Sequence, residues 1–372
     1  MFRVKELRLL QFYAMMGLLD RQAHAAVIRQ KGQAGTVFQK SMAGISRRNR
    51  CVMLQKWIST EYESLLALAG ILLAFAATLS ATAKFQGYLP KDAGREYAHD
   101  GKLSAGKPRG AGIIFVLVFV VTAFFFAPMN VELGIYLILM VLCMVTGYLD
   151  DASGTPWGRW KKGFLDLCVA ALVAMTYLRY NPNVVELAMF HVQIQIPRAV
   201  FAILIIALVW MSINVTNCSD GVDGLSGTLT IITIVTIYAL TRVLGRGTDF
   251  SYLILLFAIC ILGYLWYNAT PSRLLMGDAG SQAMGLFISI AILKTGSPLL
   301  YIPVAFVLLL DGGLGLVKVS LLKLGIRILK NTRTPIHDHV RKNWGWSNTQ
   351  TVFRFAIVQI VLGVALIYGL GL

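Results

Sequence analysis

Residues 199–227 read AVFAILIIALVWMSINVTNCSDGVDGLSG. The first part, Ala199 to Ile213, is an uncharged apolar run that predicts a helix inside a membrane. Directly after it come two carboxamides, Asn214 and Asn217, and two carboxylates, Asp220 and Asp223. Polar groups at the end of a membrane helix are costly, so we expect these four side chains to carry function.

The spacing of this polar segment suggests a ligand. Asn217, Asp220 and Asp223 fall at i, i+3 and i+6, and would share roughly one face if the segment were helical. Gly221 and Gly224 remove side chains and allow a close approach of backbone or ligand. Acids on such a surface at the membrane edge suggest a divalent cation and a phosphate.

The composition predicts an all-α, polytopic integral membrane protein. The 372 residues are 57% hydrophobic and only 14% charged. About ten apolar runs are long enough to be membrane helices, near 64–83, 111–128, 131–149, 164–179, 199–214, 226–243, 251–268, 281–295, 299–322 and 352–370. The five cysteines have no metal-ligand spacing, and we expect Cys143, Cys168 and Cys260 to be packed thiols.

The net charge of +16 does not indicate a nucleic-acid partner, because Lys and Arg concentrate in the connections between spans. Lys and Arg are more numerous in alternate connections, namely 84–110, 150–163, 215–225, 269–280 and 323–351. We therefore predict that these connections face the cytoplasm. The basic residues of 1–60 contradict this rule. The alternation of spans would place these residues on the opposite side, and three explanations are open. The tail is translocated despite its charge, the number of spans is wrong by one, or Met53 is the natural start. We favour the last, and treat 1–60 as an extension of a membrane domain at 61–372.

Two further acidic motifs lie in the connections of the same side. Asp150 and Asp151 end the third span, where they could bind Mg²⁺, handle a proton or simply mark the water interface. Asp278 follows Met276-Gly277 before an apolar run, so it could be a metal ligand or a helix cap.

Basic and imidazole side chains complete the set. Lys161 lies in Arg159-Trp-Lys-Lys162, which could anchor the membrane edge or contact phosphate. Lys102 lies in a glycine-rich segment suited to a phosphate-cradling turn. His337 and His339 cannot share a helical face at i, i+2, so we expect a loop or bent helix that binds a pyrophosphate, rather than zinc.

Taken together, these motifs resemble the polyprenyl-phosphate N-acetylhexosamine-1-phosphate transferase superfamily, and most of all its phospho-N-acetylmuramoyl-pentapeptide branch. The resemblance runs from about residue 60 to the C-terminus. It rests on the acidic pair with Tyr148, the segment 214–227, Asn268 with Met276-Gly-Asp278, and Pro335-Ile-His-Asp-His339. Gly345-Trp346 and Val352-Phe-Arg-Phe355 favour the muramoyl-peptide branch over the branch acting on UDP-GlcNAc.

The resemblance implies transfer of phospho-MurNAc-pentapeptide from UDP-MurNAc-pentapeptide to undecaprenyl phosphate, giving lipid I and UMP, the first membrane step of peptidoglycan synthesis. It implies ten membrane helices in the bacterial inner membrane and an active site facing the cytoplasm. It also implies dependence on Mg²⁺, a homodimer and inhibition by nucleoside antibiotics.

The resemblance also assigns roles. Asp278 matches the principal Mg²⁺ ligand, Asp150 and Asp151 the acidic pair, with Asp150 as the base for the lipid phosphate. The remaining matches are expected around the metal, the nucleotide, the pyrophosphate or the sugar, and they are Asn217, Asp220, Asp223, Asn268, His337, His339, Lys161 and Lys102.

The chain departs from the family at three positions. Asp338 replaces the middle histidine, Lys107-Pro108-Arg109 replaces threonine-proline-threonine, and a lysine expected near Gly154 is missing.

Several alternatives stay open at this level. The lipid phosphate could attack directly, or an Asp could attack first and form a phospho-sugar enzyme. The substrate could be UDP-GlcNAc. In another class altogether, the chain could be a secondary transporter, although its acids cluster at helix ends on one side rather than at the midplane. Asp311, deep in the ninth span, is the exception.

Overall fold

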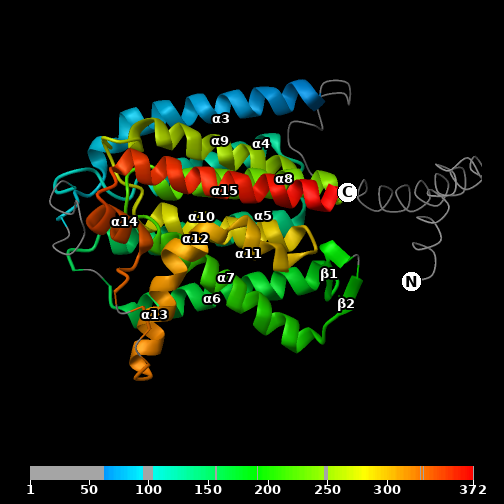
Figure 1. Ribbon diagram of the computed structural model, residues 1–372. Coiled ribbons are helices and arrows are strands. Elements are labelled where there is room, and N and C mark those ends of the chain that lie inside the picture. Colours follow the sequence, from blue (N-terminus) through cyan, green and yellow to red (C-terminus); the bar gives the residue numbers. More distant parts are fainter. Residues whose placement is uncertain are drawn as a thin grey trace, which may run out of the picture. The chain divides into compact units, whose positions relative to one another are not determined.

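The computed structural model describes residues 63–94, 104–155, 157–190, 192–246, 250–326, 328–329 and 331–371. The predictions for residues 1–60 and for Lys102 lie outside these ranges. The described part is a bundle of helices that run side by side (Figure 1). The long helices are α3 (Glu63–Phe85), α4 (Gly112–Phe126), α5 (Val131–Asp151), α6 (Arg159–Tyr180), α7 (Arg198–Cys218), α8 (Leu225–Val243), α9 (Phe250–Asn268), α10 (Gly277–Lys294) and α15 (Asn348–Gly371).

The helices confirm a polytopic membrane protein. Seven described helices are long and apolar enough to cross a membrane, namely α3, α5, α6, α7, α8, α9 and α15. An eighth candidate is a helix pair, Pro298–Val304 and Phe306–Lys323, that is bent by 72°. The other two of the ten predicted spans correspond to α4, a shorter apolar helix, and to α10, whose first turn is polar.

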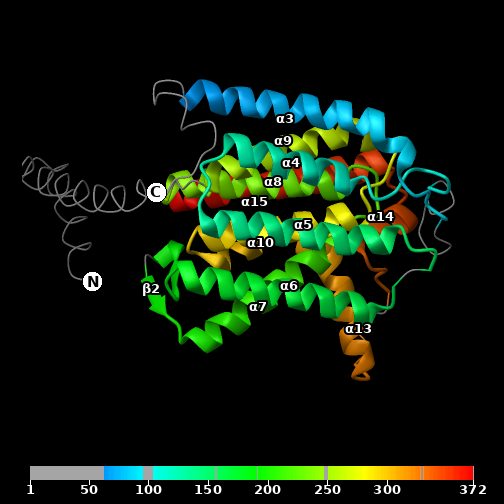
Figure 2. The ribbon, with the colours of Figure 1, turned by 180° about the vertical axis from the view of Figure 1, so that it is seen from behind.

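Helix α10 is the centre of the bundle. All its residues from Gly277 to Leu293 are buried, and it contacts α4, α5, α7, α8 and α9 (Figure 2). Small residues allow these close approaches. A Cβ on Gly112 of α4 would lie 2.0 Å from the backbone N of Gly280, and one on Gly147 of α5 would lie 2.5 Å from the carbonyl carbon of Asp278. The first turn of α10 is therefore held tightly between α4 and α5.

The bent pair contains a π-helical turn. It comprises the short helices η5 (Pro298–Leu300), α11 (Tyr301–Val304) and α12 (Phe306–Leu308), the π turn η6 (Leu309–Gly313) and α13 (Leu314–Lys323). A Cβ on Gly312 would lie 2.2 Å from the carbonyl oxygen of Val215, so η6 packs directly on α7. This turn buries Asp311 completely inside the protein.

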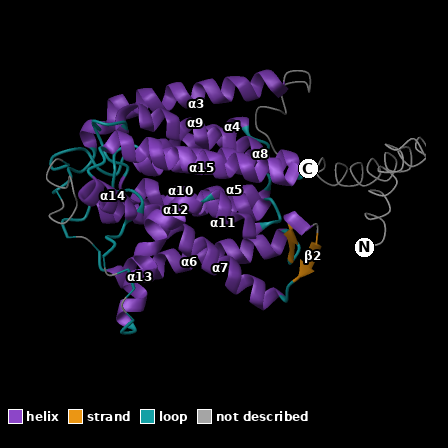
Figure 3. Ribbon diagram, in the orientation of Figure 1, coloured by secondary structure: helices purple, strands orange, loops and turns teal. Residues whose placement is uncertain are grey.

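The all-α prediction missed one hairpin. Strands β1 (Val184–Leu187) and β2 (Val192–Gln195) pair antiparallel between α6 and α7, with Val184 opposite Gln195 (Figure 3). Valine and isoleucine favour strands, but two strands of four residues give too short a signal to separate from a loop. A second local expectation also fails for Cys168, which is exposed on α6, whereas Cys143 and Cys260 are buried.

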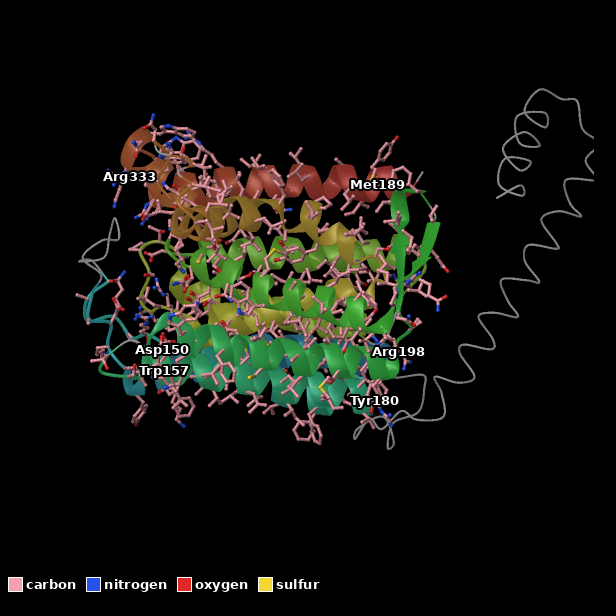
Figure 4. All side chains as sticks on the ribbon, turned by 90° about the horizontal axis from the view of Figure 1, so that it is seen from below. Asp150, Trp157, Tyr180, Met189, Arg198 and Arg333 are labelled. Carbon is pink, nitrogen blue, oxygen red and sulfur yellow. The ribbon has the colours of Figure 1, made fainter. Side chains whose placement is uncertain are left out.

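The polar connections gather at one end of the bundle. Figure 4 shows Asp150, Trp157 and Arg333 at that end, and Tyr180, Met189 and Arg198 at the other. The short helices η3 (Gln86–Tyr88) and α14 (Ile336–Trp344) follow α3 and α13 there, while η4 (Ala188–Phe190) lies in the hairpin. The motifs that the sequence scatters over almost two hundred residues thus meet on one side.

Candidate functional site

Two buried carboxylates from different helices converge on one cation. The ammonium of Lys162, in the first turn of α6, pairs with Asp150 at the end of α5 and lies 2.8 Å from Oδ2 of Asp278 at the start of α10. Asp150 and Asp278 are 5% and 6% exposed. The second oxygen of Asp150 accepts the backbone N–H of Trp157 at 2.6 Å. The acid that the resemblance assigns as Mg²⁺ ligand and the acid that it assigns as base are therefore neighbours.

Asp151 holds the beginning of helix α10. Its Oδ1 and Oδ2 accept the backbone N–H groups of Asp278 and Ala279, each at 3.1 Å. These are among the N–H groups that a helix leaves without an internal partner. Gly277, at φ +67°, leaves the room for this contact, since a Cβ there would lie 2.1 Å from Oδ2 of Asp151. The cap considered for Asp278 thus comes from a distant acid, and Asp278 is free to face Lys162.

Arg109 is the second cation of the cluster. Its guanidinium lies 2.8 Å from Asp151, 3.2 Å from Asp92 and 3.5 Å from Asp278. Burial lowers the pKa of Arg109, but the carboxylates outweigh that effect and raise it above its ordinary value. The cluster contains four carboxylates (Asp92, Asp150, Asp151 and Asp278) and two cations (Lys162 and Arg109). When all are ionised, its net charge is −2, which one divalent cation would neutralise.

The central motif does not form one helical face. Helix α7 ends at Cys218, so Asp220 and Asp223 lie in the turn that leads to α8. Asn217 remains on α7, where its amide donates to Ser281 Oγ at 3.2 Å and lies against the Asp278 carboxylate. The expected i, i+3, i+6 face is thus wrong, because α7 ends at Cys218, before Asp220.

A second group forms around Asp223. Its Oδ2 accepts the backbone N–H of Ser272 at 3.0 Å and lies 3.9 Å from the ammonium of Lys107. Lys107 and Arg109 are two residues apart, so one short segment connects the Asp223 group with the cluster at Asp151 and Asp278. The segment is the one that departs from the family pattern.

Asn268 connects two loops at the end of α9. Its Oδ1 accepts the N–H of Gly224 at 2.8 Å, and its Nδ2 donates to the carbonyl of Leu274 at 2.8 Å. It is 4% exposed. Both ends of the side chain are used by the backbone, so Asn268 fixes the shape of the loops that carry Asp223 and Asp278.

His337 is buried against the π turn. The first helical turn of α14 places its backbone N–H 2.7 Å and its Nδ1 2.8 Å from the carboxylate oxygens of Asp311. A Cβ on Gly221 would lie 2.2 Å from Nε2 of His337, so the other ring nitrogen faces the turn that carries Asp220 and Asp223. Burial lowers the pKa of His337, but Asp311 outweighs it and raises the pKa above its ordinary value.

Two other predicted residues lie away from the acids. His339 points to the other side of α14, where Nδ1 accepts the N–H of Arg333 at 3.2 Å and the ring meets Trp344 edge-on. Lys161 is exposed, and its ammonium lies 3.3 Å from the ring centre of Trp157. The proposed roles of both as phosphate or sugar contacts stay predictions.

Lys162 and Arg109 are the site residues that the sequence reading did not single out. For Lys162 a signal existed. Positions 162, 166, 170, 173 and 177 share one face of a helix, and Asp166, Ala170, Val173 and Tyr177 are all buried. Helical phase therefore places Lys162 inward and its neighbour Lys161 outward.

The acidic cluster suits a magnesium ion that also binds phosphate. The described residues contain no group of three His, Cys, Asp or Glu side chains close enough to hold a metal by themselves. However, Asp150 and Asp278 already share one cationic partner, and Asn217 adds an amide beside Asp278. Mg²⁺ takes one or two carboxylates together with substrate phosphates, so this donor set fits it.

Comparisons with known proteins agree with the sequence motifs. Residues 133–296 match the model of Glycosyl transferase family 4. The chain is 37% identical over 299 residues to the phospho-N-acetylmuramoyl-pentapeptide-transferase of Treponema pallidum, covering 75% of this chain and 82% of that protein. It is 26% identical over 343 residues to the protein of the same name from Nautilia profundicola, covering 83% and 95%.

Proposed function

Because the chain belongs to the family of phospho-N-acetylmuramoyl-pentapeptide-transferases, we propose that it transfers phospho-MurNAc-pentapeptide from UDP-MurNAc-pentapeptide to undecaprenyl phosphate, giving lipid I and UMP. It is a multi-pass membrane enzyme of peptidoglycan synthesis. The observation that carries the location of the reaction is the convergence of Asp150 and Asp278 on one point at the polar end of the bundle.

Asp278 would hold Mg²⁺, with Asn217 beside it and Asp150 facing the same point. When bound, this ion shields the negative charge of the pyrophosphate and stabilises the leaving phosphate. The support is chemical: both residues offer carboxylate oxygens to a shared cation, and both are anchored by backbone or by a second cation.

The chemical step is a displacement at phosphorus. An oxygen of undecaprenyl phosphate attacks the β-phosphorus of the UDP-sugar, and the bond from that phosphorus to the bridging oxygen breaks. UMP leaves with the bridging oxygen and its electron pair. Asp150 takes the proton of a singly protonated lipid phosphate on Oδ2, the oxygen that faces the ammonium of Lys162, whereas both oxygens of Asp151 accept N–H groups of the first turn of α10. We therefore keep Asp150 as the base and assign Asp151 to positioning Asp278.

The remaining polar groups surround the nucleotide sugar. Asp220 and Asp223 lie in the turn that His337 faces, and Asn268 holds that turn through Gly224. We assign this turn and His337 to the nucleotide and the pyrophosphate. Lys107 and Arg109 bring two positive charges to the same region.

The polar end faces the cytoplasm in this proposal. The loops there hold most of the basic residues between the spans, as expected for the cytoplasmic side. The family also leads us to propose a homodimer and inhibition by nucleoside antibiotics.

The experiment is UMP release by the purified chain in detergent. UDP-MurNAc-pentapeptide with undecaprenyl phosphate should release UMP and yield a radiolabelled lipid, whereas UDP-GlcNAc should not. Chelation by EDTA should stop release, and added Mg²⁺ should restore it. Lipid product from UDP-GlcNAc alone would contradict the proposed substrate, and full activity in EDTA would contradict the metal.

A further inference from the structure

We propose that Lys162 is an exchangeable counter-ion. It bridges Asp150 and Asp278 when no divalent cation is bound, yields that position to such a cation, and then contacts the pyrophosphate of the nucleotide sugar. The inference rests on the proposed function, because it takes the divalent cation and the UDP-sugar as the ligands of this site.

The first observation is the position of the ammonium. It contacts the carboxylates of Asp150 and Asp278 together, at the point where Asp278 would offer an oxygen to a metal ion and Asp150 faces it. Two cations cannot share this point, since their repulsion in a partly buried site is strong. Binding of a metal at these two carboxylates therefore requires Lys162 to move.

The carboxylates do not depend on Lys162 for their positions. Asp150 also accepts the N–H of Trp157 at 2.6 Å, and Asp278 lies in the helical turn that Asp151 caps. Arg109 adds a contact to Asp278 at 3.5 Å. The two carboxylates therefore keep their positions after the lysine leaves, so the exchange needs no rearrangement of the helices.

The side chain of Lys162 can move away from the carboxylates more easily than that of Arg109. The Lys162 side chain is 29% exposed, against 3% for Asp150 and 9% for Asp278, so it reaches in from the solvent side. It lies in the first turn of α6, and its flexible stem carries a compact charge that can turn. The Arg109 fork is fixed by three acids at once.

The displaced ammonium needs a new anion. Asp166 lies one turn further along the same helix, but its buried carboxylate already accepts a hydrogen bond from the amide of Asn214 at 3.3 Å. A pyrophosphate that binds beside the metal brings several negative oxygens within the reach of the same side chain. Lys162 then becomes a substrate-contacting residue, a role predicted for its neighbour Lys161.

The first test measures metal binding without turnover. Mn²⁺ is titrated into the purified full chain, and free Mn²⁺ is followed by electron paramagnetic resonance. Lys162→Met removes the competing charge and should bind Mn²⁺ on the order of tenfold more tightly than wild type. Lys161→Met, which removes the neighbouring exposed lysine, should leave the Mn²⁺ affinity unchanged. Equal or weaker Mn²⁺ binding by Lys162→Met overturns the proposal.

The second test measures the substrate contact. With Mn²⁺ saturating, Lys162→Met should bind UDP-MurNAc-pentapeptide about tenfold more weakly than wild type, as expected for a lost charge-assisted hydrogen bond. Lys162→Arg should recover most of that affinity. Unchanged binding in Lys162→Met would mean that the displaced lysine turns to Asp166 instead, and would overturn the substrate contact. Failure of wild type to release UMP would refute the proposed function, while the Mn²⁺ titration would still decide the exchange.

Discussion

Nδ1 of His337 lies 2.8 Å from Oδ2 of Asp311, across a contact between the helix α14 and the π turn of the bent pair. The backbone N–H of His337 donates to the other oxygen of the same carboxylate at 2.7 Å. This arrangement fixes the ring and leaves Nε2 as the nitrogen that faces Gly221. Asp311 was the one acid that the sequence placed deep in a span without a clear role, and the structure gives it a partner.

We expect Asp311→Asn to lower kcat/KM by about 10–100-fold, as replacement of the partner that orients a functional imidazole commonly does. The amide keeps the size of the side chain but loses the charge that aligns the ring. The measurement is UMP release, with the melting temperature in detergent as control for folding. Wild-type kinetics in this variant would show that the pair has no part in the reaction.

The same pair predicts a pH dependence of stability. In the folded protein the pKa of His337 is raised by Asp311, so the protonated ring stabilises the folded state. This stabilisation is fully present below the unfolded pKa of about 6.5 and is lost as the pH rises through the folded pKa. The melting temperature of wild type should therefore exceed that of His337→Gln by more at acidic than at alkaline pH. A difference that stays constant across this range would contradict the raised pKa.

Gly221→Ala tests the approach of His337 to the central turn. A Cβ at this exposed position would lie 2.2 Å from Nε2, so the ring or the turn must shift. We expect a clear loss of kcat/KM with little change in melting temperature. Gly154→Ala is the matched control, because a Cβ there meets nothing within 4 Å. Equal activity of both variants would show that His337 does not act through this turn.

Substitution of Asp151 should reduce stability, whereas substitution of Asp278 should reduce activity. Asp151→Ala removes the cap of α10 and a partner of the half-buried Arg109, which together should cost about 3 kcal/mol of stability. Asp278→Asn keeps the shape of the side chain, and should abolish UMP release while the protein stays folded. Thermal unfolding and Mn²⁺ titration separate the two effects. An unstable Asp278→Asn, or a stable Asp151→Ala, would reverse these assignments.

The sequence by itself determined the class of protein and the position of its polar motifs at the ends of the membrane helices. Apolar runs of membrane length are local features, and the polar motifs at their ends can be read directly from the chain. The family resemblance added the reaction. The inward direction of Lys162 follows from the phase of α6 only once the structure shows that the helix buries the face of Asp166 and Val173.

Only the tertiary structure decided which side chains meet. Lys162 and Asp278 are 116 residues apart, and Asp151 accepts the N–H of Asp278, 127 residues later. Such contacts depend on how far α5, α6 and α10 are shifted and rotated against one another. Those shifts are set by close contacts at Gly112 and Gly147, whose effect depends on the partner helix. No pattern within one segment contains that information, and for this reason Asp151 as a cap and Asp311 as the partner of His337 required the fold.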